Sequence, residues 1–350
     1  MKAKISMRAS FVFLGAVLMF IAASPGLARA VSIRVLILAD EFKSIPAPNE
    51  KLKLLDKELA KLLVGDRPYS GGVEVWRGEN SLYLIDSVDL EDYVKSVVKA
   101  ETGSNWALEA LKAQAVASRT YALYQMQKNK GLLYDVTSSV LNQVYRGDIH
   151  DDKVEKAVDE TAGQILVYGG QPIEALYHST CGNGTTEDPA EVFGFSVPYL
   201  KPVTCDCDQS PYYSWARKFP VSQIENATGV EDIKNIKIAS HTDTGRVKAL
   251  ELDGGNGPVM VNATDLRRML GWQTLPSTEF QMDFTNGYMN LEGSGYGHGV
   301  GMCQWSSQEM ARAGKSYTDI LSHFYPGATL VNSDGAPAGG VQQAATASGK

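Results

Sequence analysis

The chain has 350 residues, of which 44% are hydrophobic and 33 are glycine, a composition typical of a globular protein with one large or two modest domains. Its net charge is −7, and removal of the first 30 residues, which carry four basic residues and no acidic one, leaves −11. Such an acidic chain is not built to bind nucleic acid, and it favours an uncharged partner such as a sugar backbone.

Residues 1–30 have the three parts of a secretory signal peptide. Basic residues come first, an apolar run follows at 11–23, and small residues at 28–30 offer a cleavage point. The apolar run is shorter than the roughly 18 residues that a membrane anchor needs. We therefore expect an exported protein of the periplasm or cell wall, and not an integral membrane protein once the signal is cleaved.

Residues 31–85 read as an N-terminal β-rich and helical segment. Apolar runs predict strands at 33–38, 73–76 and 81–85, and the charged stretch 51–63 has the pattern of an amphipathic helix.

Residues 86–330 are predicted to form the main domain, with helices at 90–101, 107–126 and 305–313 and another that ends near Pro326. Apolar arms at 164–168 and 172–177 flank Gly169-Gly170, which predicts a hairpin.

A β-rich insertion is expected at about 219–292, where short alternating segments at 236–239, 247–252 and 259–261 are separated by Gly and Asn. Residues 331–350 are rich in Ala, Gly, Ser and Gln and are expected to be a disordered tail. The expected fold class is α+β, with a helical part, hairpins and a β-rich subdomain.

Glu101 ends the apolar stripe of the predicted helix 90–101. Apolar residues at 90, 93, 94, 97 and 98 recur at helical spacing, and one further step lands on position 101. A carboxyl group on that face is partly desolvated, which raises its pKa and lets it donate a proton at neutral pH. The alternative is that the helix frays at Thr102-Gly103 and that Glu101 meets solvent.

The second predicted helix, 107–126, places polar side chains among its alanines. Arg119 carries a planar fork of donors that suits a sugar hydroxyl or the orientation of Glu101, and the alternative is a surface ion pair. We include Arg119 and Tyr121 among the residues expected to bind substrate.

Three of the four cysteines lie near one histidine in the sequence, in the order His178, Cys181, Cys205 and Cys207. One histidine and three cysteines form a closed tetrahedral set for a structural zinc ion, with no position left for a catalytic water. In an exported protein, a disulfide between Cys181 and Cys205 or Cys207 is at least as natural. The sequence leaves both alternatives open.

Glycine occupies every second position from 293 to 301, around His298 and just before a predicted helix. The segment lacks the residues of a P-loop and the spacing of a dinucleotide-binding turn. Its backbone can approach a ligand closely, with His298 and Gln304 as donors, and the alternative is a tightly packed turn around a core histidine. Cys303 suits an inert small side chain at least as well as a reactive thiol.

Together these segments resemble the SpoIID/LytB family. The matching stretches are 88–101, 109–123, 177–188 and 295–305, with shorter matches at 142–147, 210–215, 270–272 and 324–327. They occur in family order over nearly the whole chain after residue 30. The departures are Cys303, where the family more often has serine, and Gly103-Ser104, where many members carry Met-Pro shortly after the glutamate.

The resemblance implies that Glu101 is the acid/base of a lytic transglycosylase, because it occupies the position of the family's catalytic glutamate. The implied substrate is the peptidoglycan glycan strand. Some relatives bind zinc through the segment that matches His178 to Cys181, which supports a zinc ion here. The founding members act in spore-engulfment wall remodelling and as modifiers of a wall amidase, which implies an amidase as a partner.

The expected reaction cleaves the bond between N-acetylmuramic acid and N-acetylglucosamine and closes a 1,6-anhydro ring. One carboxyl group suffices, whereas a hydrolase usually needs a second, for which Glu187 and Asp188 are the nearest candidates by motif. The rival function is a non-catalytic activator of an N-acetylmuramoyl-L-alanine amidase. A zinc hydrolase built on His178 is disfavoured, because a catalytic metal needs an open coordination position.

Overall fold

The computed structural model describes residues 31–37, 45–46, 51–55, 69, 71–79, 81–103, 105–148 and 150–333. The predicted signal peptide and residues 334–350 of the predicted tail lie outside the described residues. Strand β16 (Thr329–Asn332) pairs with residues 164–167, so the last sheet strand extends two residues into the segment predicted as tail.

The N-terminal part of the chain forms a five-stranded sheet. Its order is β2 (Lys53–Leu54), β3 (Glu74–Arg77), β4 (Leu82–Asp89), β1 (Ser32–Ile37) and β5 (Val136–Thr137). The β1–β5 pair is parallel and the other pairs are antiparallel. The strands predicted here are confirmed. The helix predicted at 51–63 is wrong at residues 53–54, which pair with Arg77 and Trp76 as a strand, and residues 56–63 lie outside the described residues.

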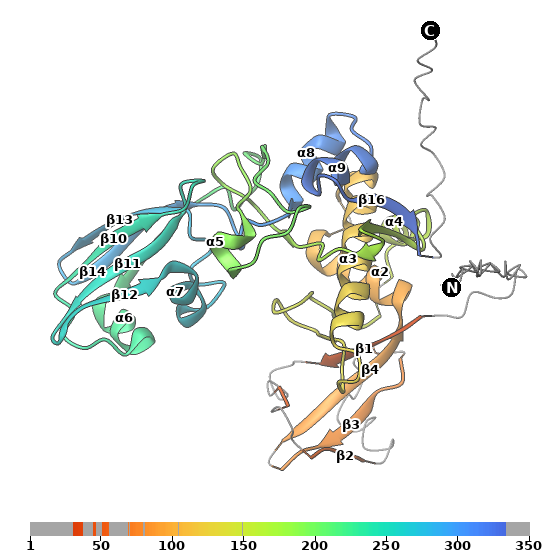
Figure 1. The fold of residues 1–350 in the computed structure, drawn as a ribbon, viewed down its shortest axis with the longest axis horizontal. Helices are drawn as coiled ribbons and strands as arrows, with labels where there is room; N and C mark the ends of the chain where they lie inside the picture. The colour runs from red at the N-terminus through yellow and green to blue at the C-terminus, as the bar shows by residue number, and fades with distance from the viewer. Residues whose placement is uncertain are drawn as a thin grey trace, which may run out of the picture. The chain divides into compact units, whose positions relative to one another are not determined.

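Two helices follow the sheet and organise the helical part (Figure 1). Helix α2 (Leu90–Thr102) starts directly after β4, where Asp89 caps it by accepting the N–H of Glu91. Helix α3 (Leu108–Lys128) packs against α2, α4 (Asp152–Asp159), α8 (Gln304–Arg312) and α9 (Tyr317–Phe324). Buried alanines on α3 allow this close packing, because small side chains let helix backbones approach one another. The predicted helices 90–101, 107–126 and 305–313 are confirmed within two residues at each end.

The hairpin predicted around Gly169-Gly170 is confirmed with a shorter second arm. Strand β6 (Gln164–Tyr168) pairs with β7 (Gln171–Pro172), and both glycines adopt positive φ, as the tight turn requires. Farther along, β8 (Tyr177–His178) pairs in parallel with β15 (Met302–Cys303). This short pairing brings the segment that follows the hairpin beside the glycine-dense segment, although the two are far apart in the sequence.

The region in which the sequence predicts a β-rich insertion contains two three-stranded sheets. One has the order β10 (Asn235–His241), β11 (Val247–Gly254) and β12 (Gly257–Asn262), and the other has the order β13 (Phe280–Thr285), β14 (Tyr288–Ser294) and β9 (Ser214–Pro220). The sequence did not predict α6 (Val221–Thr228) and α7 (Ala263–Leu270) in this region, or α5 (Pro189–Phe193) before it.

The α+β class is confirmed, since the described chain combines helices with several small, mostly antiparallel sheets. In the part of the chain that the structure describes, no helix combines the length and apolar character needed to cross a bilayer. One buried core joins α3, the β8–β15 pair and α9, and a separate core fills the β-rich insertion.

Candidate active site

Glu101 lies in the last turn of α2, and its carboxylate accepts two hydrogen bonds from segments far away in the sequence. The backbone N–H of Val144 donates to Oε1 at 3.1 Å, and Nε2 of Gln304 donates to Oε2 at 3.3 Å. The helix does not fray before this residue, because α2 continues to Thr102 and Gly103 caps it through the carbonyl of Lys99. The carboxylate is therefore held in one orientation.

The environment of Glu101 favours the protonated form of its carboxyl group. Burial raises the pKa of Glu101, and the hydrogen bonds from Val144 and Gln304 and the charge of Arg146 offset this only in part. A glutamic acid whose pKa is raised by desolvation is the form that donates a proton near neutral pH.

Beneath Glu101, a buried hydrogen-bond network joins α2 to β8. The hydroxyl of Tyr93 donates to Gln143 at 3.1 Å, and Nε2 of Gln143 donates to the hydroxyl of Tyr177 at 3.0 Å. The charge of Glu101 contributes to the raised pKa of both tyrosines, after burial, the largest cause. The sequence analysis assigned no role to Gln143, although it lies in the stretch 142–147 that resembles the family.

A pocket of about 570 Å³ opens beside Glu101. Helices α2 and α3 line one part of it, and residues of α7 and of the segment after it line another. Aromatic side chains form much of its surface, namely Tyr121, Tyr177, Phe193, Phe195, Trp272 and Tyr296. The guanidinium of Arg267 lies 4.8 Å from the ring of Trp272, and burial lowers the pKa of Arg267 to about 10. Aromatic faces with a few polar groups suit the alternating apolar and hydroxyl surfaces of a sugar.

Two histidines also line this pocket, with ring centres 5.6 Å apart. The N–H of Val300 donates to Nδ1 of His298 at 3.1 Å, which leaves the proton of a neutral ring on Nε2. Burial, with a contribution from Arg267, lowers the pKa of His298 to about 3. His178 bonds the carbonyl of Val300 through Nδ1 at 3.1 Å, so Nδ1 carries the proton there.

The remaining ring nitrogen of His178 is a buried acceptor without a hydrogen-bond partner among the described residues. Burial also lowers the pKa of His178 well below its usual range, which keeps the ring neutral. The Nε2 lone pair is enclosed by the surrounding protein, although other atoms of the ring line the pocket.

Three of the predicted substrate-binding residues lie at the pocket. Tyr121 lines it and accepts a hydrogen bond from Asn142 at 3.0 Å, and His298 and Gln304 line it as well. Nε2 of Gln304 contacts Glu101 and Gln114 rather than open space, so Gln304 orients the carboxylate.

Arg119 is the exception, and its predicted role in substrate binding is wrong. Its side chain is fully buried and forms a two-point ion pair with Glu91 of α2, at 2.8 and 2.6 Å. A further nitrogen, Nη1, donates to the carbonyl of Gln164 at 3.1 Å. Arg119 therefore joins α2, α3 and β6 in the core and does not reach the pocket.

The glycine pattern around His298 allows close packing against neighbouring segments of the protein. Gly295, Gly297, Gly299 and Gly301 all adopt positive φ. A Cβ atom would collide with the backbone of Cys181 at Gly295, with His178 at Gly297 and with Arg246 at Gly299. The segment runs tightly beside residues 176–181 and thereby holds His298 at the pocket wall.

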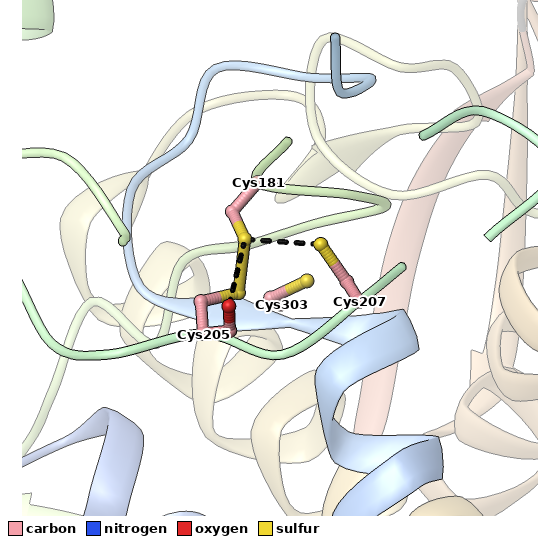
Figure 2. A group of neighbouring side chains, drawn as sticks. All are labelled: Cys181, Cys205, Cys207 and Cys303. Atoms are coloured by element: carbon pink, nitrogen blue, oxygen red, sulfur yellow. Dashed lines mark hydrogen bonds between the residues drawn. A yellow bond between two sulfur atoms is a disulfide. The ribbon is translucent and has the colours of Figure 1, made fainter. Parts of the chain in front are cut away.

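The cysteine cluster differs from the predicted set. The sulfur atoms of Cys181, Cys205, Cys207 and Cys303 all lie within 4.8 Å of one another, and His178 is not in this group (Figure 2). Cys181 and Cys205 form a disulfide, and Cys207 and Cys303 are buried free thiols. The prediction of His178 as a ligand is wrong because its ring bonds Val300 and faces the pocket instead.

The second carboxylates considered from the sequence lie elsewhere. Glu187 is fully buried and accepts hydrogen bonds from Thr242 and Thr244, and Asp188 caps α5. The pocket does contain Glu174, which the sequence analysis missed because no motif marks it. The charge of Glu174 contributes to the raised pKa values of Tyr121 and Tyr199. The charge of Glu101 contributes instead to those of Tyr93 and Tyr177.

The fold and this site define an α+β protein with a single desolvated glutamate at a pocket lined by aromatic residues. A family model described as stage II sporulation protein matches residues 78–168, which contain β4, α2 and α3. A domain of unknown function matches residues 201–301, which contain the β-rich insertion.

Relatives with curated names cover most of the chain. It is 34% identical to stage II sporulation protein D of Bacillus amyloliquefaciens, over 75% of this chain and 79% of the relative. The protein of the same name from Bacillus subtilis is 31% identical over 87% of this chain and 95% of the relative. An amidase enhancer of Bacillus subtilis is 31% identical over 68% of this chain, which spans 40% of that relative.

The chain belongs to the SpoIID family of stage II sporulation proteins, and its function is cell-wall related. The family match contains Glu101 and the helix that packs behind it.

Proposed function

We propose that the chain is an exported peptidoglycan lytic transglycosylase with Glu101 as its only acid/base. The observation that carries the proposal is the state of Glu101, a carboxyl group with a raised pKa, fixed by two donors at the edge of a pocket. Sporulation and amidase enhancement, which the relatives' names state, are both consistent with action on the wall.

In the proposed reaction, protonated Glu101 donates its proton to the oxygen between N-acetylmuramic acid and N-acetylglucosamine. The C1–O bond breaks with its electron pair on the departing sugar, and an oxocarbenium-like centre forms at C1. The Glu101 carboxylate then takes the proton of the 6-hydroxyl as that oxygen bonds to C1. The proton returns to Glu101, so the residue ends as it began and water is not consumed.

Val144 and Gln304 support this cycle because they stabilise the carboxylate that exists between the two proton transfers. Their hydrogen bonds oppose the effect of burial on the pKa of Glu101, because they stabilise the charged form of its carboxyl group.

Glu174 is the residue through which hydrolysis can be tested against this proposal. A hydrolase would need a second carboxylate across the scissile bond from Glu101. Glu174 lies 3.9 Å from Lys128 and acts electrostatically on Tyr121, on the α3 side of the pocket. We assign Glu174 to substrate contact and not to catalysis.

The test is digestion of purified glycan strands by residues 31–350, with products identified by mass spectrometry. Wild type should release 1,6-anhydro-muramyl ends. Glu101→Gln should lose roughly 10²–10⁴-fold in rate, because a general acid/base contributes about that much, while strand binding persists.

The matched control for this test is Glu174→Gln, which should cleave with anhydro products at a rate within a few-fold of wild type. Reducing ends from wild type, together with loss of activity in Glu174→Gln, would convert the reaction to hydrolysis. No cleavage by wild type on strands with or without stem peptides would end the proposal.

The amidase enhancer among the relatives favours a second candidate, activation of a wall amidase by binding. Glu101→Gln separates the two functions, because an activator should stimulate its amidase equally with either residue at position 101. Equal stimulation by wild type and variant, without strand cleavage, would favour the activator.

A further inference from the structure

Arg267 is a buried cation in the wall of the pocket. It lies in the last turn of α7, only 6% of the residue is exposed, and it lines the pocket together with Trp272 and Tyr296. Burial lowers the pKa of Arg267 to about 10, so the side chain still carries its charge at neutral pH. A buried charge destabilises the fold unless a partner compensates it.

Protein groups compensate the charge of Arg267 only in part. Nε donates to the carbonyl of Leu275 at 2.8 Å, Nη2 donates to the carbonyl of Trp272 at 3.2 Å, and the ring of Trp272 lies 4.8 Å from the guanidinium. Within the part of the chain that the structure describes, the charged groups that act on Arg267 are the phenol of Tyr296 and a second cation, Arg246, and no carboxylate pairs with it. These contacts fix the plane of the guanidinium and leave its positive charge without a counter-ion.

The third nitrogen of this guanidinium, Nη1, is free to contact a ligand. It has no hydrogen-bond partner among the described residues, and it is not one of the side-chain atoms that the protein encloses without a partner. Nη1 of Arg267 is therefore accessible, and the space that this residue borders is the pocket. Tyr296 borders the same space and lies close enough to interact electrostatically with Arg267, so its hydroxyl is a second donor there.

Two side chains with a permanent positive charge line the described pocket, and they differ in their partners. Lys128 lies 3.9 Å from Glu174, which lines the pocket as well. Both pocket histidines, His178 and His298, are kept neutral by burial. Arg267 is therefore the cation of this wall whose charge is left for a ligand. Attraction to an anionic group is strong at such a place, because little water screens it.

The proposed substrate carries one kind of anion, a carboxylate. Most of a glycan strand is neutral, because its hydroxyl and acetamido groups do not ionise near neutral pH. Each N-acetylmuramic acid also has a lactyl ether, whose carboxyl group is free in a strand without stem peptides and is an amide where a stem peptide is attached. The stem peptide then supplies carboxylates of its own. A planar guanidinium with a free N–H suits a carboxylate of either origin.

We propose that Nη1 of Arg267, with the hydroxyl of Tyr296, binds a carboxylate on the muramyl unit of the strand. This inference rests on the proposed function, since it names the group by which that substrate is positioned. Muramyl units alternate with N-acetylglucosamine units, so the group recurs at every second sugar. Arg267 therefore sets which of the two alternating bonds lies at Glu101, and it acts as a specificity residue while Glu101 performs the chemistry.

The first test measures strand binding in the Glu101→Gln chain, which holds a strand without cutting it. The ligands are strands stripped of stem peptides, strands with stem peptides, and a form of each in which every carboxyl group is converted to a methylamide. Addition of Arg267→Gln should weaken binding of a carboxylate-bearing strand about tenfold, the loss of one charged hydrogen bond, and should leave the methylamide forms unaffected. A loss on stripped strands identifies the lactyl carboxylate, and a loss only on strands with stem peptides identifies a peptide carboxylate.

The matched control is Arg268→Gln, which removes the same charge one residue farther along α7. The side chain of Arg268 is 61% exposed, pairs with Asp265 at 3.0 Å and does not line the pocket. This variant should change strand binding by less than twofold, and a tenfold loss would assign the effect to net charge and overturn the proposal. An equal loss of the methylamide forms in Arg267→Gln would show that Arg267 only maintains the pocket wall. That result, no loss on any strand, or no strand binding at all would overturn the proposal as well.

If Arg267→Gln fails to fold, the chain with Arg267 intact provides the test. Glu101→Gln alone should bind a carboxylate-bearing strand, stripped or with stem peptides, about tenfold more tightly than its methylamide form, and the difference should shrink as salt is raised. Equal affinities for both kinds of strand would overturn the proposal. Because binding is measured without cleavage, its outcome is distinct from that of the proposed activity. A strand that binds through Arg267 but is never cut by wild type would end the transglycosylase proposal alone.

Discussion

The burial of the Glu101 carboxyl group lowers the stability of the folded protein. Its apolar neighbours on α2 are the reason that it is desolvated, and desolvation is the largest cause of its raised pKa. A folded state in which an acid has a raised pKa binds protons more tightly than the unfolded state does. The residue that would perform the chemistry therefore weakens the fold wherever it is ionised.

We predict that Glu101→Gln stabilises the protein in a pH-dependent manner. In wild type, a protonated Glu101 contributes its full stabilisation of the fold below its unfolded pKa of 4.5. This contribution to stability is lost as the pH rises through the higher pKa of the folded state. The variant should therefore have a higher Tm than wild type at pH 7, with the difference shrinking toward pH 4. Thermal unfolding over this range measures it, with Glu292→Gln, at an exposed position of β14, as the control. A difference that is constant with pH would contradict the assigned cause.

At the scale of elements, the β8–β15 pair positions the site more than any helix does. It brings His178 beside Cys303 and places Gln304 at the start of α8, opposite the end of α2. Two hydrogen-bonded residues on each strand are a weak unit by themselves. Close packing of the glycine-dense segment against residues 176–181 holds them, which requires positions without side chains.

We predict that Gly301→Ala destabilises the protein more than Gly287→Ala does. Both glycines have nearly the same positive φ, 73° and 75°, so both variants lose about 1 kcal/mol to backbone strain. A Cβ at Gly301 would also collide with the carbonyl of Leu176, whereas nothing lies within 4 Å of one at Gly287. Denaturant unfolding should therefore show an additional loss for Gly301→Ala, and equal losses would argue against close packing as the reason for the glycine.

At the scale of the whole described chain, the pocket is composed of parts that the sequence keeps far apart. Glu101 and Tyr121 come from the region of the family match, and Arg267 and Trp272 come from the β-rich insertion and the segment after α7. Arg267 holds Trp272 through its ring and through its carbonyl, to which Nη2 donates at 3.2 Å. The insertion thus contributes to the binding surface and is more than a spacer.

We predict that Trp272→Ala weakens strand binding and leaves the chemical step nearly intact. Loss of one aromatic face should raise KM roughly fivefold, which corresponds to about 1 kcal/mol, with kcat within a factor of about two. Steady-state cleavage of glycan strands measures both constants. Tyr288→Ala, an exposed aromatic of the same insertion outside the pocket, should change neither, and an unaltered KM in Trp272→Ala would remove the insertion from the binding surface.

Prediction from sequence succeeded where a pattern is local. Periodicity and the Asp89 cap located α2 to within a residue, and the two glycines located the hairpin turn. It was wrong for Arg119, because a charged side chain on a helix gives no sign that Glu91 and a carbonyl of β6 neutralise it in the core. It also missed Val144 and Gln143, since a backbone N–H and an amide in a loop leave no pattern in the sequence.

By itself, the sequence determined the α+β class, the helix whose last turn carries Glu101, and the match of its motifs to one family. Each of these can be read from residues that are close together in the sequence. Tertiary structure alone decided that Cys303 rather than His178 completes the cysteine cluster and that Gln304 orients Glu101. Both outcomes follow from the pairing of β8 with β15. That register depends on how distant segments pack, a property that spacing along the chain does not record.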